Sequence, residues 1–325
     1  MAVQNNIAQF IQKYFAGFCL IFLFVGLLAG ESAASMAAAI PWFLALLTFN
    51  SGLGLRLHDL KSLRRKPWVL PLHLALLHMG MPLIAMSVSS LMGFHFDAVM
   101  GFVILAIIPI SASGMIWIGI YRGNLTLAMA LLLVDMLLAP FIIPYTLEFL
   151  FGASVHLDSF RMLKSLFWML LFPTLLALFL NRVTHSGLQR VAGGVFLFLA
   201  KVSMFMLLFI NGGVVAPFFH DFDLLFFELL SLVFFFCCFW FVFSFFIGRV
   251  VFSEDQDVIA FMFSSSIRGT ATGIVIALTF FPPLTTLVVV MNLLFQQLVG
   301  SFAGKFALNF LDNKKNPIRK ETSSQ

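Results

Sequence analysis

Long apolar segments alternate with short polar ones along almost the whole chain. Ten of them, each about 17–28 residues long, have the length that a helix needs to cross a bilayer. The loops between them are short, so we expect one compact helical domain without a soluble module. The ten ranges are 14–30, 35–53, 67–91, 98–121, 125–150, 163–181, 192–216, 224–250, 256–280 and 284–311.

The composition indicates a membrane protein and gives no sign of an enzyme. Of the 325 residues, 61% are hydrophobic and 10% are charged, whereas a soluble domain carries about 25% charged residues. The sequence offers no paired carboxylates, histidine cluster or nucleophile with a base, and no Gly-rich lysine motif for ATP. His73 and His78 are five residues apart, a spacing that does not share a helix face well, so we expect no metal site and no cofactor.

Lysine and arginine residues gather in the loops on one side of the predicted spans. The loop 56–66 holds five of them, and the loops after the fourth, sixth and eighth spans add others, as does the basic tail 314–325. The opposite loops hold none, except for Arg161 and Lys164 before the sixth span. The positive-inside rule then places both termini in the cytoplasm, in what we expect to be a bacterial inner membrane. The net charge of +5 is thus a topology signal and does not indicate nucleic-acid binding.

The fourth and ninth predicted spans are interrupted at mid-depth by small, polar and proline residues. Ten spans divide into halves of five, about 14–150 and 163–311, which enter the membrane in opposite senses, and each interrupted span is the fourth of its half. A broken helix frees backbone groups that a bilayer tolerates only beside a ligand or a wet cavity. The matched positions favour a transporter binding site over close packing of small residues. The candidate substrate-binding residues are Ser111, Ser113, Ser264, Ser265, Ser266, Thr270 and Thr272 at the interruptions, and Asn211 in the seventh span.

Arg268 lies near the middle of the ninth span, where an unpaired charge costs several kcal/mol. Its guanidinium suits a carboxylate, so it either binds an anionic substrate or belongs to a structural ion pair. Asp135 is the one carboxylate clearly in the middle of a predicted span. One hypothesis makes Asp135 a proton-coupling acid that releases Arg268 when protonated. The alternative is a permanent Asp135–Arg268 pair, and the sequence leaves both open.

Several motifs have the order and spacing of one transporter family. They are Pro-Ile-Ser-Ala-Ser-Gly at 109–114, Tyr-Arg-Gly-Asn at 121–124, Leu-Ala-Pro at 138–140 and Gln-Gln-Leu-Val-Gly-Ser at 296–301. Together they resemble helices four, five and ten of the bile acid:sodium symporter superfamily, and the resemblance extends over residues of about 14–310. It implies ten transmembrane helices in two inverted five-helix repeats, with a panel domain, a core domain, and discontinuous helices four and nine that cross at the site.

The chain departs from that family at the residues that bind sodium there. The Ser-Asn pair of the family falls here on Gly114 and Met115, and its glutamate falls on Ser264. Sodium needs several oxygen ligands, which glycine and methionine side chains cannot supply. Arg268 stands about where a sodium-binding side chain would be. The resemblance therefore implies a transporter scaffold that has lost the usual sodium sites.

We expect a secondary active transporter that moves a small organic anion, a carboxylate or sulfonate, by alternating access, with proton coupling or uniport. One alternative is a sodium-coupled bile-acid-like symporter with rearranged ion sites. Another is a non-transporting membrane scaffold or channel. The transporter domain would span 1–313, with lipid and the organic anion as partners, and the oligomeric state stays open, a homodimer included.

Overall fold

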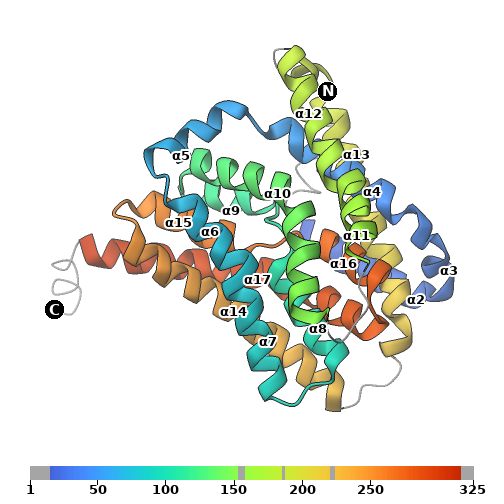
Figure 1. Cartoon of the computed structure of the whole chain (residues 1–325). Helices are drawn as coiled ribbons and strands as arrows, with labels where there is room; N and C mark the ends of the chain where they lie inside the picture. The colour runs from blue at the N-terminus through green and yellow to red at the C-terminus, as the bar shows by residue number, and fades with distance from the viewer. Residues whose placement is uncertain (1–14, 153–157, 185–186, 220–223, 316–325) are drawn as a thin grey trace, which may run out of the picture.

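The computed structural model describes residues 15–152, 158–184, 187–219 and 224–315, and in these ranges the chain is α-helical (Figure 1). In chain order the elements are α2 (Phe15–Ala29), α3 (Glu31–Ala34), η1 (Ser35–Ala39), α4 (Ile40–Gly54), η2 (Leu57–Leu60), α5 (Lys61–Arg65), α6 (Val69–Ala75), η3 (Leu76–Gly80), α7 (Met81–Leu91), α8 (Phe96–Ile107), α9 (Gly114–Ile120), α10 (Leu125–Phe151), α11 (Ser159–Leu166), η4 (Phe167–Leu171), α12 (Phe172–Val183), α13 (Gly187–Val215), η5 (Ala216–Phe219), α14 (Leu224–Val251), α15 (Asp255–Ser266), α16 (Thr270–Phe280) and α17 (Pro283–Lys315).

Seven helical stretches of the described chain are long and apolar enough to cross a membrane. This confirms the expected all-helical membrane protein. The remaining three predicted spans correspond to the shorter helix α2 and to two helices that are broken in the middle. The seven stretches are Glu31–Gly54, Val69–Leu91, Leu125–Phe151, Ser159–Val183, Val191–Val215, Leu224–Val251 and Pro283–Asp312.

Both interruptions predicted from the sequence are real breaks. The fourth predicted span consists of α8 and α9, separated by the linker 108–113. The ninth consists of α15 and α16, separated by the linker 267–269. Because a helix of about 12 residues reaches only about 18 Å, each broken pair needs both of its halves to traverse a bilayer.

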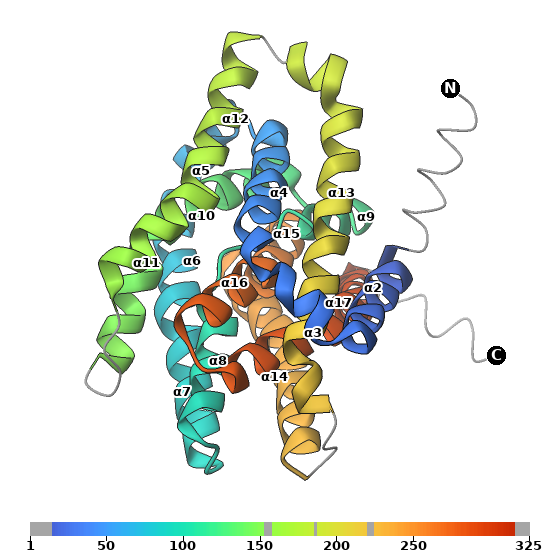
Figure 2. The ribbon, with the colours of Figure 1, turned by 90° about the vertical axis from the view of Figure 1, so that its right-hand side faces the viewer.

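The helices pack in two groups. In the first, α2 and α4 lie against α13, and α12 lies against α4 (Figure 2). The second holds α7, α8, α10 and α14 to α17, with α14 beside α15 and α17, and α8 beside α7 and α17 (Figure 1). The two breaks belong to this second group.

Glycines bring α2 and α13 into backbone contact. A Cβ atom added to Gly26 would lie 2.0 Å from the carbonyl oxygen of Phe209, and one added to Gly212 would lie 2.3 Å from that of Leu23. Small residues at such positions are a usual basis of helix association in membranes, because they allow dense contact where no hydrophobic effect operates.

Two prolines account for two widened, π-helical turns. Pro82 and Pro173 follow η3 and η4, each within the first two positions of the next helix. A proline cannot donate to the carbonyl four residues earlier, so a turn with i to i+5 bonding allows the helix to continue. At η4, the carbonyl of Met169 instead accepts a 2.8 Å hydrogen bond from the hydroxyl of Thr48 on α4.

Candidate functional site

The two helix breaks lie side by side and pair in antiparallel fashion. Ile110 faces Arg268 in an isolated β-bridge. On one side of the bridge the amide of Ser111 donates to the carbonyl of Ile267 over 3.0 Å, and on the other side the amide of Gly269 donates to that of Pro109 over 2.8 Å. We call the two paired linkers, 108–113 and 267–269, the crossing. This pairing gives hydrogen-bond partners to the backbone groups on the facing edges of the two linkers. Buried backbone groups in apolar surroundings require such partners.

The outer edge of each linker is closed by one side chain from another helix. Asp135 on α10 accepts a 2.7 Å hydrogen bond from the amide of Ile110 through Oδ2. Gln296 on α17 accepts from the amide of Arg268 over 2.9 Å and donates to its carbonyl over 3.1 Å. The amide group of Gln296 thereby takes the place of a neighbouring strand. It was not among the predicted site residues.

The guanidinium of Arg268 is buried within the second helix group, with 2% of the residue exposed. Its Nη1 donates to the carbonyl of Ile108 over 3.3 Å, and its Nη2 contacts the sulfur of Met81 at 2.7 Å. Its Nε is buried without a hydrogen-bond partner. A thioether is a weak acceptor, so the charged group is incompletely satisfied by the protein.

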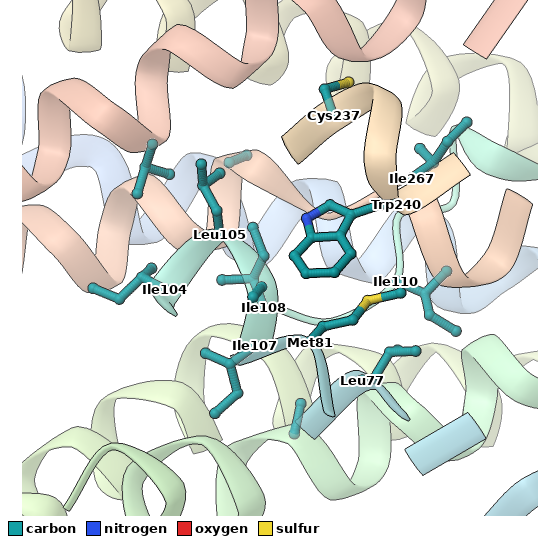
Figure 3. Close-up of a cluster of buried hydrophobic side chains, with 14 of the residues drawn as sticks. Leu77, Met81, Ile104, Leu105, Ile107, Ile108, Ile110, Cys237, Trp240 and Ile267 are labelled. Atoms are coloured by element: carbon teal, nitrogen blue, oxygen red, sulfur yellow. The ribbon is translucent and has the colours of Figure 1, made fainter. Parts of the chain in front are cut away.

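Apolar side chains surround the crossing and keep its local dielectric low. Met81, Ile108, Ile110 and Ile267 converge there, with the indole of Trp240 beside them (Figure 3). Electrostatic interactions are stronger in such surroundings than in water, and unpaired polar atoms are correspondingly expensive.

Asp135 and Arg268 do not form an ion pair in this structure. Both are buried, and the charge of Asp135 lies within electrostatic range of Arg268. However, both oxygens of Asp135 are already occupied, Oδ2 by the Ile110 amide and Oδ1 by the Nε2 atom of His78 at 2.8 Å. A permanent structural pair, which the sequence left open, is therefore absent from this conformation.

Two histidines that sequence reasoning set aside reach the site. His78 bonds to Asp135, and His73 on α6 places its Nδ1 at 3.2 Å from the hydroxyl of Ser265. The widened turn η3 contains His78 and changes the helical register, so the five-residue spacing no longer separates the two side chains. The signal that could have revealed this is Pro82, four residues after His78.

Several predicted hydroxyl residues bond within the protein at or beside the crossing. Ser111 and Ser113 join their hydroxyls at 2.9 Å, and Ser266 donates to the carbonyl of Trp240 over 3.0 Å. Thr270 accepts a hydrogen bond from the side chain of Asn292 over 3.2 Å. These contacts hold the linkers in shape.

The other three predicted polar residues are buried, and two of them have side-chain atoms without hydrogen-bond partners. Ser264 is buried with an unpartnered hydroxyl, and Thr272 is buried in the first turn of α16. Asn211 lies on α13 in the first helix group, and no hydrogen bond joins it to the crossing. Both polar atoms of its amide are buried without partners.

One apolar hollow lies against the helices of the second group. A hollow of about 180 Å³ lies against α14, α15 and α17 and offers almost no polar surface to an anion. Among the described residues, no three His, Cys, Asp or Glu side chains converge in a way that could hold a metal ion. The hollow is lined by Cys238, Phe241, Val242, Phe245, Met262, Val299, Phe302, Ala303 and Phe306.

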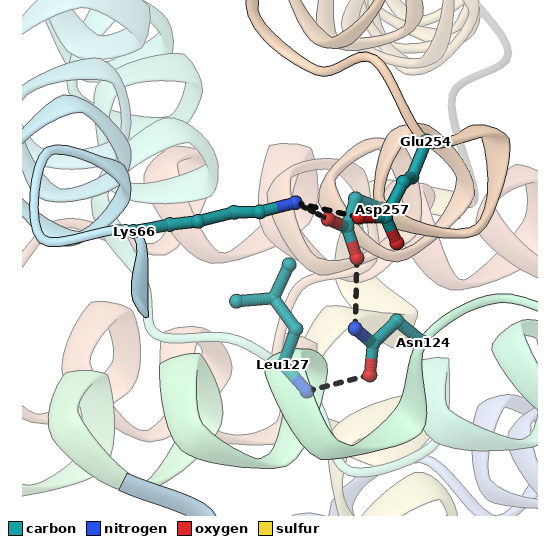
Figure 4. Close-up of polar contacts among 5 residues, drawn as sticks. All are labelled: Lys66, Asn124, Leu127, Glu254 and Asp257. Carbon is teal, nitrogen blue, oxygen red and sulfur yellow. Dashed lines mark hydrogen bonds and ion pairs between the residues drawn. The ribbon is translucent and has the colours of Figure 1, made fainter. Parts of the chain in front are cut away.

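A second polar cluster joins three loops at one end of the molecule. Lys66 forms an ion pair with the buried carboxylate of Asp257 and lies 3.4 Å from Glu254 (Figure 4). Asn124 donates to the other oxygen of Asp257 over 2.8 Å and caps α10 by accepting from the amide of Leu127 over 3.1 Å. We call Lys66, Asn124, Glu254 and Asp257 the loop clasp. The hydrogen bond with Asp257 raises the pKa of Lys66 above its ordinary value.

Comparison with known proteins agrees with this architecture. The chain is 29% identical to the uncharacterized protein YbaS of Bacillus subtilis (strain 168), over 89% of its own length and 95% of that protein. It is 24% identical to the uncharacterized sodium-dependent transporter YocS of the same organism, over 55% of its own length and 56% of that protein. Residues 12–304 match the SBF-like CPA transporter family, which confirms the resemblance to bile acid:sodium symporters. The chain belongs to the SBF-like CPA transporter family.

Proposed function

We propose that this protein is a secondary active transporter that carries a small organic anion, a carboxylate or sulfonate, by alternating access. The observation that carries the proposal is the crossing itself, in which two broken helices meet in a buried region and hold an incompletely satisfied arginine between them. Non-helical backbone at membrane depth is characteristic of transporter binding sites. The transport role is that of the family, whereas the substrate class rests on the chemistry of Arg268.

The inverted repeat is part of this proposal. It is supported by the two side chains that bond to the outer edges of the linkers. Asp135, on the helix after the first break, bonds to Ile110 in that break. Gln296, on the helix after the second break, bonds to Arg268 in that break. The two halves thus use the same relation between their fourth and fifth spans, as two copies of one unit of opposite orientation would.

Arg268 acts in this proposal as a built-in cation. Its contact with the Ile108 carbonyl lies just past the C-terminal end of α8, where a helix carries partial negative charge. The free Nε and the weakly bound Nη2 remain available to a carboxylate or sulfonate, which accepts two parallel hydrogen bonds from a guanidinium. Ser264, with its unpartnered hydroxyl, would supply a further donor.

Coupling is proposed to involve protons and the buried carboxylate of Asp135. The carboxylate lies in electrostatic range of Arg268, so any change in charge next to it alters how firmly Arg268 holds an anion. The competing candidate is sodium coupling, which the printed name of YocS describes for that protein.

The orientation of the chain is proposed from the loop clasp. Lys66, Asn124 and Glu254 lie in the loops after the second, fourth and eighth predicted spans, which is the side rich in lysine and arginine. Their meeting at one end of the molecule supports a common cytoplasmic side, in a bacterial inner membrane, with both termini on that side.

The test is thermal stabilisation of the purified protein by an organic-acid panel of acetate, lactate, succinate, benzenesulfonate and taurocholate, in sodium and in potassium buffers. We expect at least one acid to raise the unfolding temperature equally in both buffers. Arg268→Ala should lose that increase, whereas Arg64→Ala, at an exposed position, should keep it.

Two results would contradict the proposal. An increase that needs sodium would favour the sodium-coupled alternative. An increase that survives in Arg268→Ala would remove this residue from the substrate site.

A further inference from the structure

We propose that His78 carries the proton that the transporter exchanges, and that Asp135 stays ionised as its fixed counter-charge. This inference rests on the proposed function and names the proton-accepting atom of the coupling site. It rests on the hydrogen bonds around His78 and Asp135.

The contacts of Asp135 favour its ionised form. Its Oδ2 accepts from a backbone amide, that of Ile110, which can only donate. Its Oδ1 faces the Nε2 of His78 at 2.8 Å. A hydrogen on Oδ2 would cost the hydrogen bond from Ile110. A hydrogen on Oδ1 would make Nε2 the acceptor and move the ring hydrogen of neutral His78 to Nδ1, where no acceptor lies. The ionised carboxylate satisfies both partners, so it is the form that this geometry stabilises.

His78 is held in the complementary way. Because Asp135 is an acceptor, Nε2 of His78 carries the hydrogen of the neutral ring, and Nδ1 is left with a lone pair. That Nδ1 is buried without a hydrogen-bond partner. When one half of the transport cycle opens the site to water, Nδ1 takes a proton from hydronium, an N–H bond forms, and one water molecule is released. The imidazolium then lies against the carboxylate of Asp135, which offsets much of its desolvation cost.

The charged and titratable groups around His78 restrict when it can be protonated. The elements packed against η3 are α6, α7, α8 and α10. From them His73 on α6 and Asp135 on α10 face the ring, whereas α7 has no titratable residue and Asp97 lies at the far end of α8. Beyond Asp135 stands the guanidinium of Arg268. The positive field of Arg268 opposes a second positive charge, so an anion bound there favours protonation of His78.

Counting charges gives the direction of coupling. With His78 neutral, the unit charges of Arg268 and Asp135 cancel in the buried cluster. A monovalent anion bound at Arg268 leaves one uncompensated negative charge, and a proton on His78 removes it. By linkage each ligand strengthens the binding of the other, which predicts electroneutral symport of one proton with one monovalent anion.

The first experiment uses protons alone as the probe, without any organic anion. Protein with ¹⁵N-labelled histidine rings in lipid nanodiscs is titrated between about pH 5 and 9, and the imidazole nitrogen shifts are recorded. We expect a ring that is neutral with hydrogen on Nε2 at high pH and gains a hydrogen on Nδ1 as the pH falls. That signal should be absent from His78→Gln and retained in His58→Gln, a variant at an exposed position. Asp135→Asn should lower the proton affinity of the ring at least tenfold.

A second measurement starts from the wild type and uses a variant only to assign a band. Infrared difference spectra of the wild type between high and low pH should show imidazole bands and no carboxylic-acid band that is sensitive to proton exchange at the site. A protonated carboxyl band that Asp135→Asn removes would overturn the inference and place the proton on Asp135. A His78 ring that stays neutral throughout the titration would also overturn it.

The outcomes separate this inference from the proposed function. If His78 titrates as expected but no acid of the panel stabilises the protein, the substrate class is wrong and the proton site stands. If an acid stabilises the protein through Arg268 but His78 does not titrate, the anion site stands and this inference fails.

Discussion

A single side chain, Gln296, holds the backbone of the residue that bears the buried charge. Its amide accepts from the N–H of Arg268 and donates to the C=O of the same residue. Asn292, one turn earlier on α17, donates to the same Gln296 oxygen over 3.1 Å and fixes the orientation of the amide. The position of the guanidinium therefore depends on a residue that never touches it.

This dependence predicts the effect of Gln296→Met, which keeps the length of the side chain and removes both hydrogen-bonding groups. Each backbone group left buried without a partner costs about 1–3 kcal/mol, so the protein should unfold at a clearly lower temperature. Gln296→Glu keeps the acceptor and loses the donor. Its unfolding temperature should fall between those of the wild type and Gln296→Met, and its carboxylate adds repulsion against the Arg268 carbonyl. Unfolding in detergent, followed by tryptophan fluorescence, measures both. Wild-type stability in Gln296→Met would show that the linker needs no such closure.

Sequence reasoning located part of the site at this scale. Arg268, Asp135 and Ser265 were found because a charged or polar residue in an apolar span stands out by itself. Gln296 and His78 were missed because their roles depend on partners far away in the chain, and nothing in their own neighbourhood marks those partners. The sequence left open whether Asp135 pairs with Arg268, and in the structure the partners of Asp135 are His78 and a backbone amide.

At the scale of helices, the pattern of apolar segments predicted the elements well. All ten ranges contain helix, and both predicted interruptions are breaks. The widened turns η3 and η4 were not predicted, although each precedes a proline that removes one helical hydrogen bond. The proline signal is local, whereas the choice between a kink and a widened turn depends on packing, as the Thr48–Met169 hydrogen bond at η4 illustrates.

Contact between α2 and α13 predicts opposite effects for two glycines of the same helix. Gly212→Ala would place a methyl group 2.3 Å from the carbonyl of Leu23 and force the helices apart, so we expect a loss of more than about 1 kcal/mol. Gly194→Ala has nothing within 4 Å and should be neutral or stabilise by about 0.5–1 kcal/mol through lower backbone freedom. The two variants serve as controls for each other in a thermal unfolding assay, and equal shifts would argue against close contact at Gly212.

At the scale of the whole molecule, the loop clasp is a charged contact that joins the two sequence halves. Lys66 belongs to the first half, and Asp257 and Glu254 belong to the second. Asp257 is 2% exposed and Lys66 is 30% exposed, so the pair is partly screened by water. Its position across three loops makes it a contact that must break if those loops separate during transport.

Stability should depend on the clasp in a pH-dependent manner. The pKa of Lys66 is raised in the folded protein, so its contribution is fully present below the ordinary lysine value of 10.5 and is lost as the pH rises above it. Lys66→Met should therefore lower the free energy of unfolding by about 1 kcal/mol at neutral pH. The difference from wild type should shrink in alkaline buffer above pH 10.5.

The matched control for this prediction is Lys61→Met, an exposed lysine near the start of the same loop region. It should not change the unfolding temperature measurably at either pH. A Lys66→Met deficit that persists unchanged in alkaline buffer would show that lost packing of the lysine stem, and not its charge, is responsible.

The pairing at the crossing has a consequence for how the chain is made. The ribosome delivers α8, its following linker and Met81 long before Arg268, which lies 160 residues after Ile108 and 187 after Met81. The most expensive side chain to insert into lipid therefore arrives when its carbonyl and sulfur acceptors are already in the membrane. The closing amide of Gln296 follows 28 residues later. Insertion of the buried arginine is therefore a late step in the biogenesis of this protein. A chain truncated before α17 would lack Gln296 and would leave the amide and carbonyl of Arg268 unpaired in the bilayer.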